Sequence, residues 1–308
     1  MSKVLIATEK PFAAVAVNGI KKIFDEAGFE TVLLEKYTDK ADLIKAVEDI
    51  DAMIIRSDKA SADVIAAARN LKIIVRAGAG FDNIDIAAAN EKKIVAMNTP
   101  GQNSNAVAEL ALGMMVFMAR AQFKGGSGSE LKGKKLGIHA FGYVGKYVAK
   151  IAKGFGMELY AYDPFIDKSV IENEGVIALN SEEELYSTCQ YISLHIPANE
   201  KTKKSINYNL LSKMPKGATL VNTARKEVVD EDSLKKILEE RQDFKYISDI
   251  APDCHAEIAD KFENRYYATP KKQGAETSEA NINAGLAAAN QIVGFLKKGI
   301  STFQVNKF

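Results

Sequence analysis

The feature that most constrains this chain is an alternation of short apolar runs, rich in valine and isoleucine, with longer segments of helical periodicity. In the first third the apolar runs cover residues 4–8, 31–34, 52–56, 72–76 and 94–97. The segments between them, such as 13–27, 42–50 and 60–68, have apolar residues spaced three and four positions apart. Continuous apolar strands are buried on both faces, which is typical of a parallel sheet covered by helices.

A second series of the same kind fills the rest of the chain. Its apolar runs cover residues 135–140, 158–162, 191–196, 219–223, 246–250 and 265–269, with helical patterns in the intervals and a long alanine-rich one at 276–298. A helix predicted at 104–123 precedes this series. The glycine- and serine-rich run 125–129 is either a flexible linker or a surface loop. The pattern therefore predicts two α/β domains.

Composition narrows the classes of function. The chain has 308 residues and a formal net charge of +1, which suits two domains and disfavours a nucleic-acid partner. The cysteines Cys189 and Cys254 and the histidines His139, His195 and His255 show no disulfide or metal-ligand spacing, so no metal site is expected. We see neither a signal-peptide layout nor a membrane-spanning segment, and we expect a cytoplasmic protein without membrane partners.

A strand-to-helix turn at residues 140–145 carries the sharpest local signal. Gly142 would let the backbone approach a pyrophosphate, and Gly145 would let the helix pack closely on the strand. Tyr143 and Val144 open that helix, whose N-terminus favours negative charge. The usual first glycine is Ala140 here, and its Cβ costs about 1 kcal/mol if the position needs a positive φ.

The following strand, at 158–162, ends in Asp163. An acidic residue at this place accepts hydrogen bonds from the ribose hydroxyls of a dinucleotide. It would also repel a 2′-phosphate, so the sequence predicts NAD rather than NADP as the cofactor.

Five motifs occur in a fixed order, at 78–85 (GAGFDNID), 97–100 (MNTP), 107–110 (VAEL), 194–197 (LHIP) and 221–225 (VNTAR). Together they resemble the D-2-hydroxyacid dehydrogenases over nearly the whole chain. The resemblance implies two doubly wound parallel-sheet domains of the Rossmann or flavodoxin type. The NAD-binding domain, 100–274, would be inserted into a substrate domain of 1–99 and 275–308, with the active site between them. It also implies a homodimer.

The resemblance further implies the role of several residues. Arg225 would bind the substrate carboxylate through its guanidinium fork, assisted by backbone N–H groups of Ala77, Gly78 and Ala79. Asp249 would meet the nicotinamide carboxamide. Beyond the glycine turn and Asp163, the implied cofactor contacts are His195, Pro197, Thr223, Ala224, Asp249, Lys272 and Gly274.

The histidine that transfers the proton in the family is absent from the matching segment, 269–277 (TPKKQGAET). The Gly-Ala turn aligns Lys272 with it, whereas counting from Pro270 gives Lys271. The carboxylate that the family pairs with that histidine is missing as well, at Cys254. Since a lysine base needs its pKa lowered from about 10.4, loss of the carboxylate is consistent with Lys272 as the base.

Arg56, Ser57 and Arg76 stand at strand ends of the first series, where they would bind a phosphate. These three residues resemble the phosphate contacts of family members that act on a phosphorylated substrate. The resemblance therefore implies NAD-dependent oxidation of 3-phosphoglycerate to 3-phosphohydroxypyruvate, the first step of phosphorylated L-serine biosynthesis. Reduction of glyoxylate or hydroxypyruvate is the alternative, since those substrates carry no phosphate. An NAD-sensing, corepressor-like binding protein is a third reading.

Overall fold

The computed structural model describes residues 1–308 as two compact units. The first unit comprises Met1–Asn103 and Thr277–Phe308, and the second comprises Ser104–Glu276. Each unit has one sheet in which every neighbouring pair of strands is parallel. The predicted α/β class with two parallel-sheet domains is thereby confirmed.

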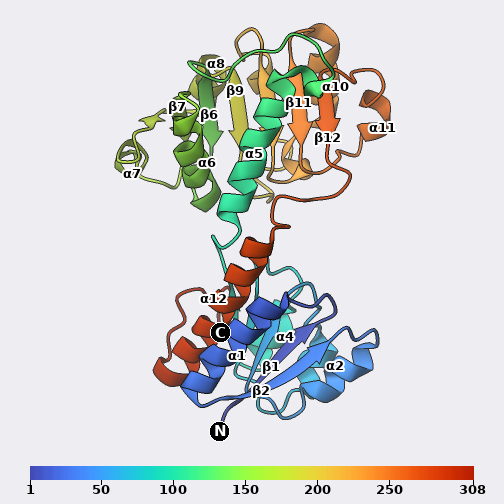
Figure 1. Ribbon diagram of the computed structural model, residues 1–308, viewed down its shortest axis with the longest axis vertical. Coiled ribbons are helices and arrows are strands. Elements are labelled where there is room, and N and C mark those ends of the chain that lie inside the picture. Colours follow the sequence, from blue (N-terminus) through green and yellow to red (C-terminus); the bar gives the residue numbers. More distant parts are fainter. The chain divides into compact units, whose positions relative to one another are not determined.

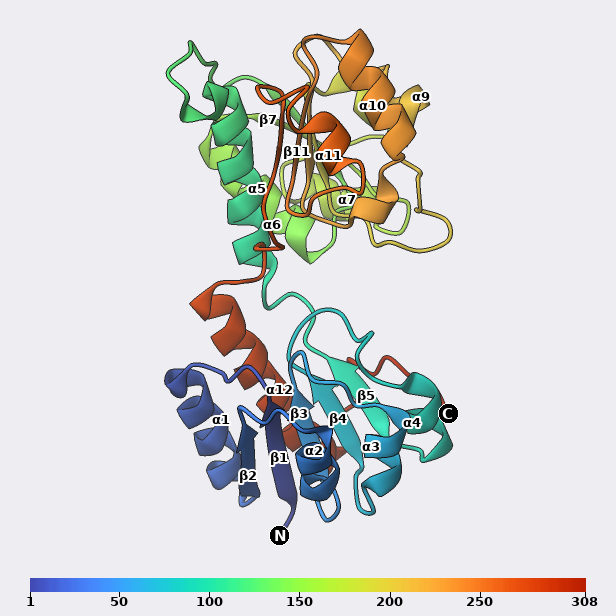
Figure 2. The same ribbon diagram turned by 90° about the vertical axis from the view of Figure 1, so that its right-hand side faces the viewer.

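The first unit has a five-stranded sheet in the order β2-β1-β3-β4-β5. Helices α1 and α12 cover one face, and α2, α3 and α4 cover the other (Figure 2). Both faces of β1, β3, β4 and β5 are buried, which explains their unbroken apolar runs, whereas the edge strand β2 is partly exposed. The elements are β1 (Lys3–Thr8), α1 (Ala14–Ala27), β2 (Glu30–Glu35), α2 (Lys40–Ala46), β3 (Ala52–Ile55), α3 (Ala62–Ala67), β4 (Ile73–Arg76), α4 (Ile86–Glu91), β5 (Val95–Asn98) and α12 (Ser278–Lys298).

The second unit has a seven-stranded sheet in the order β12-β11-β10-β9-β6-β7-β8. Helices α5 and α6 pack on one face (Figure 1), and α8, α9, α10 and α11 contribute to the core on the other. The strands are β6 (Lys135–His139), β7 (Glu158–Tyr162), β8 (Ile177–Ala178), β9 (Tyr191–Leu194), β10 (Thr219–Asn222), β11 (Lys245–Ser248) and β12 (Tyr266–Ala268). The helices are α5 (Ser104–Ala119), η1 (Ala121–Phe123), α6 (Tyr143–Gly154), α7 (Lys168–Glu172), α8 (Glu182–Thr188), α9 (Tyr208–Leu211), η2 (Lys226–Val228), α10 (Glu231–Glu240) and α11 (His255–Ile258).

The predicted helix 104–123 is shorter in the structure. It ends at Ala119, and Ala121, Gln122 and Phe123 follow with positive φ values of 51°, 55° and 59°. The side chain of Gln122 is buried, where its amide donates to the Glu263 carbonyl at 2.8 Å. The run 125–129 is an exposed loop within the second unit.

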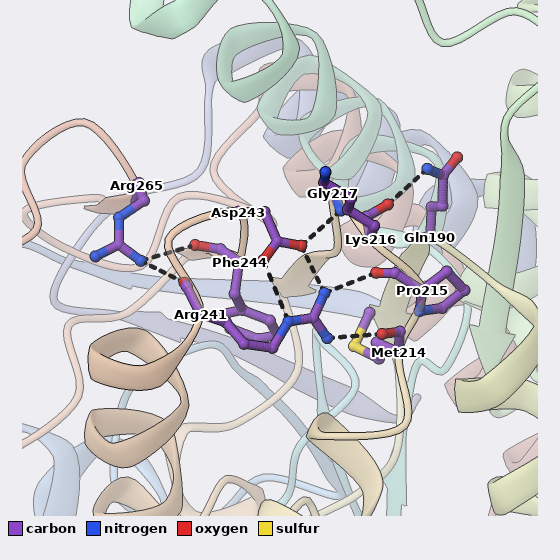
Figure 3. A network of polar contacts seen from close by, with 9 residues as sticks. All are labelled: Gln190, Met214, Pro215, Lys216, Gly217, Arg241, Asp243, Phe244 and Arg265. Carbon is purple, nitrogen blue, oxygen red and sulfur yellow. Dashed lines mark hydrogen bonds and ion pairs between the residues drawn. The ribbon is translucent and has the colours of Figure 1, made fainter.

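A polar network ties loops together at the amino end of β10 and β11 (Figure 3). The Arg241 guanidinium donates to the carbonyls of Met214 and Pro215 at 2.6 and 2.9 Å, and to Asp243 at 2.6 Å. Asp243 also accepts the N–H of Gly217 at 2.7 Å. The guanidinium holds the pKa of Asp243 at about 2, below its usual value of 3.8.

Candidate functional site

The glycine turn of the second unit closes tightly between β6 and α6. Ala140 has a φ of 78°, and its N–H donates to the Tyr162 carbonyl at 2.9 Å. A Cβ at Gly145 would lie 2.4 Å from the Ala140 carbonyl oxygen, whereas one at Gly142 would meet nothing within 4 Å. Gly145 is therefore required for helix packing, and the backbone at Gly142 is open to a ligand.

Asp163, at the end of β7, is bonded to the same turn. Its carboxylate accepts the N–H of Phe141 at 2.8 Å and that of Phe165 at 2.9 Å. A carboxylate has about four acceptor positions, so the residue retains capacity for ribose hydroxyls. The carboxylate that the sequence predicted as a ribose acceptor thus also orders the glycine turn.

Two of the histidines are held neutral in this unit. Burial lowers the pKa of His139 to about 4, and its Nδ1 lies 3.3 Å from the Tyr186 hydroxyl. Burial, and then the neighbouring His139, lower the pKa of His195 to about 3, and its Nε2 lies 2.9 Å from the Ser193 hydroxyl. Neither contact places these rings in a proton-transfer role. Pro197, two residues beyond His195, accepts the Thr202 hydroxyl at 2.5 Å through its carbonyl.

The turn after β10 is shaped by Asn222. Its side chain accepts the N–H of Ala224 at 3.0 Å and donates to the carbonyl of Arg225 at 3.0 Å. The Arg225 side chain is exposed at this turn. The Thr223 hydroxyl is buried and has no hydrogen-bond partner within the protein. Because a buried hydroxyl without a partner is unfavourable, it fits a group that a bound dinucleotide would satisfy.

The loop 269–276 follows β12 and carries both candidate lysines. Lys271 is exposed and Lys272 is half-buried, so the two differ in their surroundings. Asp249, at the end of β11, is 2% exposed and accepts hydrogen bonds from this loop, including the N–H of Gly274 at 2.7 Å.

The acidic residues near Cys254 are engaged elsewhere. Asp253 pairs with Lys226, which raises the pKa of that lysine, and Glu257 pairs with Lys235 at 3.1 Å. Burial raises the pKa of the Cys254 thiol to about 12. Neither carboxylate therefore replaces the one that the family places at this position.

In the first unit, the candidate phosphate-binding residues Arg56 and Arg76 are joined by a hydrogen bond to one backbone carbonyl. The carbonyl of Arg56 accepts the Nε of Arg76 at 3.0 Å and the side-chain amide of Asn83 at 3.3 Å. Arg76 also lies over Gly78, where a Cβ would stand 1.9 Å from its Nη1. Arg76 thus holds the turn of Arg56 and Ser57 as well as presenting charge.

The glycine loop has fewer open donors than its sequence suggests. The N–H of Ala77 donates to the Ile55 carbonyl at 2.8 Å, and that of Gly78 donates to the Arg76 carbonyl at 2.9 Å. The Asn98 amide fixes the Ala79 carbonyl at 2.6 Å. An anion at this loop would therefore be met by the N–H groups of Ala79 and Gly80.

Asp58 is the residue that sequence reasoning missed at this edge. It is 1% exposed and accepts the N–H of Glu9 at 2.6 Å, the Tyr37 hydroxyl at 2.7 Å and the N–H of Arg56 at 3.2 Å. Burial, followed by the hydrogen bond from its hydroxyl to Asp58, raises the pKa of Tyr37 well above its ordinary value. An acidic residue three positions after the end of the apolar strand β3 was the one available signal.

No group of three or more His, Cys, Asp or Glu side chains in the structure is arranged to hold a metal ion. None of the helices combines the length and apolar content needed to cross a bilayer.

Residues 88–267 match the family model described as "D-isomer specific 2-hydroxyacid dehydrogenase, NAD binding domain". The fold is similar to a crystal structure of NAD⁺-bound 3-phosphoglycerate dehydrogenase from Entamoeba histolytica. That match has 52% identity and a TM-score of 0.86, and it covers 100% of this chain and 99% of the other.

The chain is also similar to two curated relatives that have different names. The chain is 38% identical over 304 residues to D-3-phosphoglycerate dehydrogenase of Methanocaldococcus jannaschii, covering 92% of this chain and 57% of the relative. It is 40% identical over 219 residues to hydroxypyruvate reductase of Thermotoga maritima, covering 67% of this chain and 70% of the relative. The chain thus spans little more than half of the first relative's length.

Proposed function

The chain belongs to the D-isomer-specific 2-hydroxyacid dehydrogenases and carries their NAD-binding domain, and we propose that it oxidises D-3-phosphoglycerate to 3-phosphohydroxypyruvate. This is the first step of the phosphorylated route to L-serine. The observation that supports it most is the full-length similarity, at 52% identity, to a structure named as 3-phosphoglycerate dehydrogenase. The unit of residues 104–276 is then the cofactor domain, and the other unit is the substrate domain.

The residues of the cofactor domain are assigned the following roles. The turn of Gly142 and Gly145 and the carboxylate of Asp163 hold the dinucleotide, which supplies the hydride acceptor when bound. Arg225 holds the substrate carboxylate in a bidentate manner and polarises the adjacent C2 oxygen. Neutral Lys272 takes the proton of the C2 hydroxyl, and protonated Lys272 returns it in the reductive direction.

Arg56 and Ser57 are assigned to the substrate phosphate. The arrangement that supports this assignment is the shared Arg56 carbonyl, through which Arg76 and Asn83 fix the turn. Because the backbone of this turn is already ordered, phosphate binding by Arg56 and Ser57 would carry no further cost of ordering the loop.

Hydroxypyruvate reductase is the second candidate, because a relative with 40% identity carries that name. Purified protein should be assayed through the near-ultraviolet absorbance of NADH, with 3-phosphoglycerate and NAD⁺ in one direction. Phosphohydroxypyruvate, hydroxypyruvate and glyoxylate would be compared with NADH in the other. Arg56→Ala should raise KM for the phosphorylated substrate alone, whereas equal effects on all substrates would favour the reductase. Tight NADH binding without any turnover would favour the sensor.

The protein would act in the cytoplasm as a homodimer. Both cysteines are free and buried, which suits a reducing compartment. An apolar surface at the end of α5 supports a dimer: the ring of Phe117 lies 5.4 Å from that of Phe123 and 4.9 Å from that of Tyr267. Phe123 is 67% exposed. Light scattering at several concentrations would test the dimer, and Phe123→Ser should weaken it.

A further inference from the structure

The loop of residues 269–276 carries the proposed proton-transfer group, and we call it the lysine loop. It leaves the sheet at the end of β12, which pairs with β11 through Ser248 and Ala268. The N–H of Thr269 continues this pairing by donating to the Ser248 carbonyl at 3.0 Å. The loop then turns away from the sheet, so its course beyond Thr269 depends on other contacts.

One buried carboxylate supplies those contacts from the neighbouring strand. Asp249 Oδ1 accepts the Thr269 hydroxyl at 3.0 Å and the N–H of Gln273 at 2.8 Å. Its Oδ2 accepts the N–H of Gly274 at 2.7 Å. The three donors come from both ends of the lysine loop. Asp249 therefore closes the loop at its base, with Lys271 and Lys272 at the crest.

The surroundings of the carboxylate fit this arrangement. Asp249 is 2% exposed and Thr269 is 5% exposed, so water is largely excluded from the contacts. A Cβ at Gly274 would lie 2.9 Å from Asp249 Oδ2 and 3.3 Å from the side chain of Val107. The glycine thus permits the short approach. Hydrogen bonds to an ionised acceptor in such a site are stronger than those between neutral groups.

From this geometry we infer that Asp249 is a positioning residue that holds Lys272 in place through the backbone of the lysine loop. The inference rests on the proposed role of Lys272. A lysine side chain is long and flexible, so the position of its backbone limits where the ammonium group can reach. Proton transfer requires an approach of about 2.6–3.2 Å, and a small displacement of the loop would lower kcat rather than substrate affinity.

The same carboxylate retains about one of its roughly four acceptor positions. The family resemblance implies that this position accepts the amide of the nicotinamide carboxamide. Asp249 would then link the occupied cofactor site to the order of the lysine loop.

Replacement of Asp249 by asparagine shows why a carboxylate is needed here. An amide has one acceptor oxygen and one donor nitrogen. In either orientation, its NH₂ would face the N–H of Gln273 or that of Gly274. Because Asp249→Asn would also alter any cofactor contact, a variant that touches the loop alone is the better probe.

Thr269→Val removes one of the three contacts without changing Asp249. We expect kcat to fall about tenfold while KM and the Kd for NADH change less than about twofold. Thr269→Ser keeps the hydroxyl and should restore kcat. Hydrogen exchange of the Gln273 and Gly274 amides, measured by NMR, should speed up in Thr269→Val. Thr219→Val, a buried control at the start of β10, should lose stability but keep both kcat and the exchange rates.

Unchanged kcat in Thr269→Val would overturn the inference, whether or not the exchange is faster, as would a lower kcat with unchanged exchange. Failure of the proposed function is seen separately. A wild-type protein that turns over none of the substrates, or a Lys272→Ala variant that keeps full activity, would remove the role that Asp249 is inferred to support.

Discussion

The carboxyl edges of the two sheets use the same device on loops of different chemistry. In the five-stranded sheet, Asp58 accepts hydrogen bonds from Glu9, Tyr37 and the turn of Arg56. In the seven-stranded sheet, Asp249 accepts hydrogen bonds from the lysine loop. One carboxylate orders the turn of the arginine proposed to bind a phosphate, and the other orders the loop of the lysine proposed to transfer a proton. Two equally buried carboxylates thus differ in the segments that they hold.

The largest expected effect lies in the lysine loop. Lys272→Ala should lower kcat by about 10²- to 10⁴-fold, the usual contribution of a general base. Lys271→Ala, its exposed neighbour, is the matched control and should leave kcat within about twofold. Steady-state kinetics with the best substrate would measure both. If Lys271→Ala lost activity and Lys272→Ala kept it, the lysine would have to be reassigned.

A smaller effect is expected at the arginine-bearing edge. Asp58→Asn puts an NH₂ group among three donors, so it should lower the free energy of unfolding by about 1–3 kcal/mol. It should also raise KM for the phosphorylated substrate several-fold with little change in kcat, because Arg56 loses its fixed turn. Asp25→Asn, on the exposed surface of α1, serves as the control. A fall in kcat without a rise in KM would contradict the division between the two edges.

A substitution at the amino edge of the seven-stranded sheet should lower the stability of the protein without changing its kinetics. The pKa of Asp243 in the folded state is about 2, below the ordinary 3.8. Its stabilisation is thus nearly complete above about pH 5 and is lost as the pH falls through 4 toward 2. Discounted for solvent screening, it is worth on the order of 1–2 kcal/mol. Asp243→Asn should destabilise the protein at neutral pH and flatten this acid dependence in denaturant titrations, while kcat stays unchanged. A changed kcat would show that the two edges are coupled.

The smallest effect is expected at Ala140. Its φ of 78° costs an L-residue about 1 kcal/mol, and Ala140→Gly would remove this strain. Part of that gain is cancelled, because glycine also increases the backbone freedom of the unfolded chain. Thermal melts should therefore show a gain of less than about 1 kcal/mol, with the Kd for NADH nearly unchanged. A loss of stability would mean that the methyl group makes compensating contacts.

The parts of the fold set by local pattern were predicted from the sequence. The strand runs, the glycine turn and the family were all readable, and the family is confirmed by the comparisons. The two-residue strand β8 was not predicted, because so short a strand leaves no periodicity. The left-handed turn of Ala121, Gln122 and Phe123 was also missed, since none of these residues ordinarily favours a positive φ.

The contacts that the sequence did not predict join loops that are far apart in the chain. Asp58 meets Glu9 across 49 positions of sequence, and Asp249 meets Gly274 across 25. Arg241 reaches the Met214 carbonyl across 27 positions. These pairings depend on which strands become neighbours, which the residues themselves do not reveal. The roles of Lys272, Arg225 and Arg56 remain predictions.

The division of the first unit into two stretches of chain has a consequence for biosynthesis. Residues 104–276 are contiguous and can fold as soon as they leave the ribosome, whereas the first 103 residues lack α12 until the whole of that stretch has been synthesised. At ~5–20 residues per second, the intervening stretch imposes a wait of roughly 9–35 s. Until α12 arrives, the apolar face that it covers, including Ile54 and Val75, is open to solvent. The nascent chain should therefore depend on holding chaperones during that interval.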